Sequence, residues 1–368
     1  MTGKIINYYA GGNTAKGFYS LFDSALKGLN RLYILKGGPG TGKSFLMKSI
    51  AREMVNRGYD IQQIHCASDN QSIDGVIINS LKFGIVDGTA PHVLEPNLPG
   101  IVEEYVNLGV AWDSAKLVEH KKEIKELNEK ISRAYQKAYA SFAEALKIHD
   151  EWERIYIQNM DFVAANKTTE DLIKTIFQDQ RVNKSPDVRH RFLGAATPEG
   201  PNDFINNLTE DIAKRYFIKG RPGSGKSTML KKIAARAENS GFDVEIYHCG
   251  FDPNSLDMVV VRELSVAIFD STAPHEYDPV RETDEIIDMY EKAISPGTDE
   301  KYAAELKEIA NRYRKNMNAG TGYLAEAKSL RDQLESFYKD AMDFNKVDQI
   351  RNEIQAEIDR VTQFTAAD

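Results

Sequence analysis

Two glycine-rich segments of this 368-residue chain have the residue types and spacing of a phosphate-binding loop. Each ends in Gly-Lys-Ser, and the numbering places Lys43 and Lys226 183 positions apart. In such a loop, backbone N–H groups surround the phosphates, the lysine neutralises the terminal phosphates and the serine hydroxyl ligates Mg²⁺. The sequence therefore predicts two nucleoside triphosphate sites. The predicted nucleotide-binding residues are Gly38, Pro39, Gly40, Thr41, Gly42, Lys43, Ser44 and Phe45 in the first loop and Arg221, Pro222, Gly223, Ser224, Gly225, Lys226, Ser227 and Thr228 in the second.

An aspartate follows a short apolar run downstream of each loop. Asp87 comes after Phe83–Val86 and Asp270 after Val266–Phe269, in each case 44 positions beyond the loop lysine. A carboxylate in this place can hold Mg²⁺, because the ion keeps several waters and accepts one or two protein carboxylates. An aspartate that only caps a loop is the alternative. The predicted metal-binding residues are Ser44, Asp87, Ser227 and Asp270.

The residues after these aspartates are Gly88 and Ser271, whereas many motor-type ATPases have a glutamate there to activate water. Both segments then continue Thr-Ala-Pro-His. Histidine can titrate near neutral pH, so His92 and His275 are candidates to contact the γ-phosphate or its acceptor. The alternative is a loop histidine that hydrogen-bonds to the backbone. The predicted catalytic residues are Lys43, Asp87, His92, Lys226, Asp270 and His275.

A zinc site is a second interpretation of the polar residues near the first loop. His65, Cys66, Asp69 and His92 include the imidazole and thiolate ligands that zinc prefers. Neighbouring residues of a strand point to opposite faces, so His65 and Cys66 cannot easily share one ion. Bound zinc is therefore the less favoured interpretation.

The nucleotide is expected to be ATP. Asn345-Lys346-Val347-Asp348 fits the Asn-Lys-x-Asp signature of GTPases, but that signature has to follow a hydrophobic strand. Here it follows residues 337–344, which have a helical pattern, and the corresponding residues 163–166 of the first half lack it. We therefore interpret the match as chance.

The elements around the loops must position these side chains. Apolar runs at Arg31–Lys36 and Arg215–Lys219 predict buried strands before each loop, and apolar residues at helical spacing predict a helix after it. Second strands are expected at Asp60–Ile64 and Asp243–Tyr247. Each ends in a His-Cys pair, which should lie near the phosphates because the carboxyl ends of parallel strands gather at the ligand crevice.

The next expected elements are helices that begin at Ser72 and Ser255. Serine is a favoured N-cap, and Asp74 and Asp257 would then lie in the first turn, where an anion suits the helix dipole. The expected fold class is α/β, with two tandem domains, each a parallel sheet in a three-layer α/β/α arrangement with a long helical or coiled-coil-like arm.

The two halves of the chain are copies of each other. Residues 36–96 align with residues 219–279 without a gap, and 27 of the 61 pairs are identical. Such similarity indicates an internal duplication. The predicted domains are residues 1–183 and 184–368, a division that suits the chain length, and the polar segment from residue 181 to 187 is typical of a linker.

A charged segment with helical periodicity follows the third strand of each half. We place these arms at about residues 115–163 and 298–363, and residues 117–160 alone would form a helix about 65 Å long. In the second arm, Gly320-Thr321-Gly322 suggests a hairpin turn. The arms are expected to pack against another helix, or to act as a lid or protein-binding arm that moves with nucleotide state.

Composition limits the classes of partner and location. The net charge of −8 and the isoelectric point near 5.6 argue against a nucleic-acid partner. No apolar run approaches the roughly 20 residues that a membrane helix needs, and the first residues lack a secretory signal pattern. Cys66 and Cys249 occupy equivalent places in the two halves and form no disulfide framework. We therefore expect a cytoplasmic protein.

Taken together, the motifs resemble those of the P-loop NTPase superfamily in both halves. More narrowly, His-Cys-x-x-Asp, Ser-Ile-Asp or Ser-Leu-Asp, and Asp-x-Thr-Ala-Pro-His in two tandem copies are similar to a family of uncharacterised bacterial ATPases described as related to nucleotide kinases. The resemblance implies ATP binding by Lys43, Ser44, Lys226 and Ser227. Unlike well-studied small-molecule kinases, the chain has no obvious arginine-rich lid.

The expected function is Mg²⁺-dependent hydrolysis of ATP. One alternative is a kinase for a nucleotide or small metabolite, with the arms closing over the acceptor. Another is a non-enzymatic, ATP-dependent switch that binds a partner protein through its arms. Arg221 replaces Gly38 in the second loop, so the two sites need not be equivalent.

Overall fold

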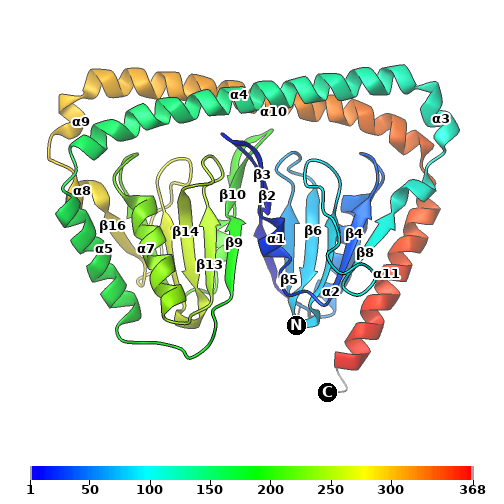
Figure 1. Cartoon of the computed structure of the whole chain (residues 1–368), viewed down its shortest axis with the longest axis horizontal. Coiled ribbons are helices and arrows are strands. Elements are labelled where there is room, and N and C mark those ends of the chain that lie inside the picture. The colour runs from blue at the N-terminus through cyan, green and yellow to red at the C-terminus, as the bar shows by residue number, and fades with distance from the viewer. Residues whose placement is uncertain (1, 366–368) are drawn as a thin grey trace.

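The computed structural model describes residues 2–365, and each repeat contributes one six-stranded sheet (Figure 1). The sheets have matching strand orders, β1-β5-β6-β7-β4-β8 and β9-β13-β14-β15-β12-β16. A short hairpin follows the first strand of each sheet. The strands of the first repeat are β1 (Ile5–Tyr8), β2 (Gly11–Thr14), β3 (Gly17–Ser20), β4 (Arg31–Lys36), β5 (Ile61–His65), β6 (Ile73–Ile78), β7 (Phe83–Asp87) and β8 (Glu103–Asn107). Those of the second are β9 (Val188–Phe192), β10 (Gly194–Thr197), β11 (Gly200–Asp203), β12 (Lys214–Lys219), β13 (Val244–His248), β14 (Leu256–Val261), β15 (Val266–Asp270) and β16 (Glu285–Asp288).

Both sheets are mixed, so the prediction of parallel sheets was wrong. β6 and β14 run antiparallel to both of their neighbours. The connection from β5 to β6 spans only residues 66–72, whereas a parallel neighbour needs a crossover of a dozen residues or more. The helices expected at Ser72 and Ser255 are therefore replaced by strands, and Asp74 and Asp257 lie buried within the sheets.

The outer face of each sheet is covered by helices, and one of these comes from the other repeat. α2 (Lys43–Asn56) and α7 (Lys226–Asn239) follow the glycine-rich loops, as predicted. α5 (Phe162–Phe177), from the first repeat, lies against α7, while α11 (Phe344–Thr365), from the second, lies against α2 (Figure 1). The two repeats therefore exchange their last helices.

Two long helices connect the exchanged segments. α4 (Lys121–Gln158) and α10 (Ala303–Ala341) run side by side in opposite directions across both sheets (Figure 1). Apolar side chains of the two helices form clusters along this pair, as the apolar stripe predicted. α4 is about 57 Å long at 1.5 Å per residue, because the segment before it forms the separate helix α3. The shorter helices are α1 (Phe22–Ala25), α3 (Ser114–Glu119), α6 (Ile205–Leu208), α8 (Met289–Ala293) and α9 (Thr298–Lys301), with 3₁₀ turns η1 (Asn79–Leu81), η2 (Leu108–Ala111) and η3 (Arg262–Leu264).

The inner faces of the sheets share one core. A single apolar cluster contains residues of both sheets together with residues of α1 and α6. α1 packs against β9 of the second sheet, and α6 packs against β1 of the first. The expected α/β/α layering therefore holds on the outer side of each sheet, but it is wrong on the inner side, where the repeats cover each other.

The hairpin expected at Gly320-Thr321-Gly322 is also wrong, because α10 continues without interruption through these residues. The structure gives Gly320 a different role. A Cβ atom added to Gly320 would lie 2.3 Å from the Phe142 ring of α4, whereas one added to Gly322 would meet nothing within 4 Å. Gly320 is thus the residue that lets the two long helices approach each other at the Phe142 ring.

We expect Gly320→Ala to lower the free energy of unfolding by about 1–3 kcal/mol, because the buried Phe142 ring must move to make room for the methyl group. Gly322→Ala is the matched control, since it adds the same group to the same helix in open space. It should raise stability by up to about 1 kcal/mol, because alanine favours a helix more than glycine does. Urea unfolding of both variants tests this pair of predictions, and equal effects of the two substitutions would contradict the packing role.

Candidate functional site

The two glycine-rich loops have the same backbone conformation. Each lies between the strand next to one edge of its sheet and the first residue of a helix, with β4 and α2 around the first loop and β12 and α7 around the second. Gly40 and Gly42 have φ angles of 72° and 90°, and Gly223 and Gly225 have 73° and 90°, in the left-handed region that only glycine adopts easily. A tight turn of this kind that opens a helix presents backbone N–H groups to an anion.

The lysine of each loop lies against an acid from a neighbouring strand. Lys43 donates hydrogen bonds to the carbonyl oxygens of Gly37 and Gly38, and its Nζ is 3.6 Å from Oδ2 of Asp87. Lys226 Nζ is likewise 3.6 Å from Oδ2 of Asp270. Burial lowers the pKa of Lys43, and the charge of Asp87 opposes that change. The ammonium groups therefore lie at the loops, beside the aspartates that the sequence predicted to bind Mg²⁺.

The serine and aspartate predicted to bind Mg²⁺ are held by hydrogen bonds from other residues. The hydroxyl of Ser44 accepts from the N–H of Ile73, at 3.0 Å, and Ser227 accepts equivalently from Leu256. Oδ1 of Asp87 accepts from the N–H and hydroxyl of Thr89, at 2.9 and 2.6 Å. These bonds fix both side chains while leaving Asp87 Oδ2 facing the ammonium of Lys43.

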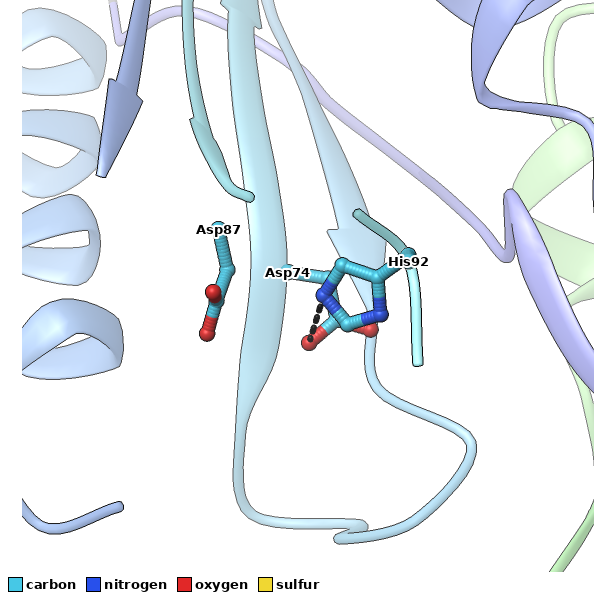
Figure 2. Close-up of side chains that lie close together, drawn as sticks. All are labelled: Asp74, Asp87 and His92. Carbon is cyan, nitrogen blue, oxygen red and sulfur yellow. Dashed lines mark ion pairs between the residues drawn. The ribbon is translucent and has the colours of Figure 1, made fainter. Parts of the chain in front are cut away.

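A buried histidine completes a three-residue group in the first site. Figure 2 shows Asp74, Asp87 and His92 close together, and their nearest ligand atoms all lie within 4.8 Å of one another. His92 Nε2 is 3.9 Å from Oδ1 of Asp74, yet neither ring nitrogen has a hydrogen-bond partner. The ring stacks on Phe22 with a centroid distance of 5.1 Å. Burial raises the pKa of Asp74, so this carboxyl group is easier to protonate than an exposed one. His92 thus has donor and acceptor capacity that the described protein atoms do not use.

The equivalent histidine of the second site is paired. His275 donates from Nδ1 to Oδ2 of Asp203 at 2.9 Å, and its Nε2 is 3.8 Å from Oδ2 of Asp257. Burial acts to lower the pKa of His275, but Asp203 and Asp257 outweigh it and raise that pKa. Burial raises the pKa of Asp257 to about 6. The position that corresponds to Asp203 in the first repeat is Ser20, so only the second site has this pair.

We expect His275→Gln to lower the free energy of unfolding by about 1 kcal/mol more at pH 5.5 than at pH 9. A pKa raised in the folded protein means that protonated His275 stabilises the fold. This contribution is complete below the unfolded pKa, near 6.5, and disappears as the pH rises through the folded-state pKa. Urea unfolding at both pH values measures the difference. The difference should become smaller in an Asp203→Asn background, where only Asp257 and Asp270 still raise the pKa of His275. An unchanged difference there would contradict the assigned pair.

The remaining residues predicted near the sites differ in where they lie. The side chain of Phe45 is 69% exposed and that of Thr228 is also exposed, so neither side chain packs into the core. His65 hydrogen-bonds to Asn7, while Cys66 lies beside Asp74. Among residues 2–365, the ligand group predicted for zinc is not assembled. The Asn-Lys-x-Asp segment lies at the start of α11, and the residues before it belong mostly to α10 and not to a strand.

The sequence did not predict the residues that the two long helices, α10 and α4, bring to the loops. The last turns of α10 cover the first loop: a Cβ atom added to Gly40 would lie 2.9 Å from the carbonyl oxygen of Glu335, and one added to Gly38 would lie 2.7 Å from the Tyr338 ring. α4 covers the second loop in the same way, through Glu153. Each loop is therefore completed by a helix of the other repeat.

Comparisons of the chain with protein-family models, curated proteins and solved structures found no match. No helix within residues 2–365 is both long and apolar enough to cross a membrane. Cys66 and Cys249 are free. The function of the chain is therefore inferred from the residues of its two loops.

Proposed function

We propose that the chain binds Mg²⁺ and ATP at both glycine-rich loops and hydrolyses ATP to ADP and phosphate. One observation carries this proposal. In both repeats a lysine at the first residue of a helix lies 3.6 Å from an aspartate 44 positions later in the chain. In each repeat, the glycine-rich loop and the strand that ends in aspartate are far apart in the sequence but bring these two side chains together. The pair lies at the end of a loop suited to anions.

The oxygen atoms beside each lysine fit Mg²⁺. Ser44 and Asp87 would hold the ion in the first site, and Ser227 and Asp270 in the second, because Mg²⁺ prefers hydroxyl, carboxylate and water oxygens. When bound, the ion neutralises charge that develops on the phosphate oxygens. The lysines contribute donors to the same phosphates. Together these groups suit a triphosphate better than a neutral ligand.

His92 and Asp74 supply the proton acceptor in the first site. In hydrolysis, a water oxygen forms a bond to the γ-phosphorus while the bond to the bridging β,γ-oxygen breaks, and the water loses a proton. His92 is buried and has no hydrogen-bond partner among the described residues, so a ring nitrogen is free to receive that proton. Asp74, 3.9 Å away, would stabilise the resulting imidazolium.

Phosphate release by the purified chain tests the proposal against its alternatives. Steady release of phosphate from Mg²⁺ and ATP, without any acceptor, is the expected result. Release of ADP only when a metabolite mixture is added would instead identify a kinase. Tight ATP binding with no turnover would identify a switch whose long helices bind a partner.

The two free cysteines support a cytoplasmic location.

A further inference from the structure

The helices that cover the two loops differ in charge. The residues of α10 that face the first loop and the residues of α4 that face the second occupy equivalent positions, 182 apart. Two of the four positions keep their residue type. At the other two positions, α10 has a lysine and an arginine where α4 has a leucine and a histidine. The α10 residues are Lys328, Arg331, Glu335 and Tyr338, and their α4 counterparts are Leu146, His149, Glu153 and Tyr156.

Lys328 and Arg331 lie two turns and one turn before Glu335, the α10 residue that touches the first loop. Lys328 Nζ is 2.5 Å from Oδ1 of Asp332 on its own helix and 3.8 Å from Oδ2 of Asp69, which lies in the connection between β5 and β6. Arg331 is one turn before Glu335, whose backbone touches the loop at Gly40, and its Nε is 3.9 Å from the Glu335 carboxylate. Lys328, Arg331 and Glu335 are spaced three and four residues apart, so they share one face of the helix. That face is the one turned to the loop.

The electrostatic environment of Arg331 agrees with this placement. Burial acts to lower the pKa of Arg331, but nearby Cys66 and Tyr135, with Glu335 and Asp74, outweigh it and raise that pKa. Arg331 also contributes to the lowered pKa of Lys43, after the larger effect of burial. The charge of Asp74 thus acts on both the guanidinium of Arg331 and the ammonium of Lys43.

The α4 positions equivalent to Lys328 and Arg331, over the second loop, hold no lysine or arginine. His149 lies 3.8 Å from Glu153, and burial lowers its pKa, so the imidazole is largely neutral at pH 7.5. Leu146 packs into an apolar cluster of the helix pair. Arg221, the additional arginine of the second loop, is held by Asp299 at 2.8 Å. His275 is bonded to Asp203, whereas His92 has both ring nitrogens unpartnered.

We propose that the two sites are unequal: Arg331, with Lys328, completes the first site and confines rapid ATP hydrolysis to it, while the second site holds nucleotide and turns it over slowly. This inference rests on the proposed function. Negative charge spreads over the γ-phosphate oxygens during phosphoryl transfer, and a fixed cation beside them lowers the barrier. Because Arg331 belongs to the second repeat, the first site is active only when both repeats are assembled in one chain.

Single-site variants of the full chain test the inequality. Lys226→Ala removes the ammonium of the second site, so phosphate release should fall only by the slow share that this site contributes. Lys43→Ala leaves only the second site and should lose about 100-fold. Equal turnover in the two variants, with nucleotide still bound by both, would overturn the inference while leaving the proposed function standing. If the wild-type chain binds no ATP, the proposed function fails, and this inference with it.

Substitutions of Arg331 test its role. Arg331→Ala should lower kcat about 100-fold while changing the Kd for Mg²⁺ and ATP only a few-fold, and Arg331→Lys should restore part of the rate. Arg312→Ala is the matched control, because Arg312 lies on the same helix and pairs with Glu151 and Glu308 away from the loops. His149→Arg in the Lys43→Ala background should raise the residual turnover. A kcat unchanged by Arg331→Ala, in a protein with wild-type thermal stability, would overturn the assignment.

Discussion

Replacing Lys43 and Lys226 together with alanine is expected to abolish measurable hydrolysis of ATP and to weaken nucleotide binding at least about 100-fold. Each ammonium is mostly buried at the start of a helix and lies 3.6 Å from its aspartate, so its removal takes a fixed positive charge from the end of the loop. The fold should survive. In the first site, Asp87 keeps both hydrogen bonds from Thr89 after Lys43 is removed.

The control for this double variant is Lys232→Ala with Arg52→Ala. Both residues are exposed on the same two helices, α7 and α2, and lie outside the glycine-rich loops. The control removes the same number of positive charges. Binding of a fluorescent ATP analogue and release of phosphate should match the wild-type values in the control and be lost in the double variant. Retention of both activities in the double variant would show that the loops are not the nucleotide sites.

The second large effect is expected from Asp87→Asn combined with Asp270→Asn. Asparagine has nearly the same shape, so Thr89 and Thr272 can still donate to the remaining oxygen. The negative charge that would hold Mg²⁺ is lost, however, and the buried ammonium of each lysine loses its counter-charge. We expect turnover at saturating ATP to fall about 100-fold or more, and the Mg²⁺ concentration for half-maximal activity to rise.

A Mg²⁺ titration of phosphate release measures both consequences of this aspartate substitution. Nucleotide affinity in the presence of a chelator should change little, because the carboxylates act through the ion. Asp171→Asn, an exposed acid of α5 that pairs with Lys167, is the control and should leave both quantities at wild-type values. An unchanged Mg²⁺ midpoint in the double variant would refute the assignment of these acids as metal ligands.

The strands, loops and helices next to the motifs were predictable because their signals are local. The runs before Gly37 and Gly220 and before Asp87 and Asp270 are short, apolar and bounded by glycine or charged residues, and each forms a buried strand. The Gly-Lys-Ser ends also predicted where both following helices begin. Each of these signals lies within one short stretch of neighbouring residues.

Two kinds of local signal predicted the wrong element, because the same residue types also occur inside strands and helices. Ser72 and Asp74 have the spacing of a helix N-terminus, yet Ile73–Ile78 is a buried strand, and only its short connection to β5 reveals the direction of pairing. Gly320 fits the pattern of a turn, yet it lies inside α10, where the Phe142 ring of α4 leaves no room for a side chain. In each case a contact distant in sequence decided the structure.

The exchange of helices between repeats could not be derived from the repeats alone. Equivalent sequences can pack within their own half or across to the other, and the same periodicity serves both arrangements. Arg331 therefore gave no sign that it would lie over a loop nearly 290 residues earlier in the chain. A comparison of the two arms at equivalent positions would have shown the difference between Arg331 and His149, although not its location.

Calorimetric titration of the full chain with a slowly hydrolysed ATP analogue and Mg²⁺ tests the central claim most directly. The account predicts saturable binding to two sites per chain, reduced to one in Lys43→Ala and in Lys226→Ala. Absence of binding heat from both adenine and guanine triphosphates, with Mg²⁺ present and the chain folded, would contradict it.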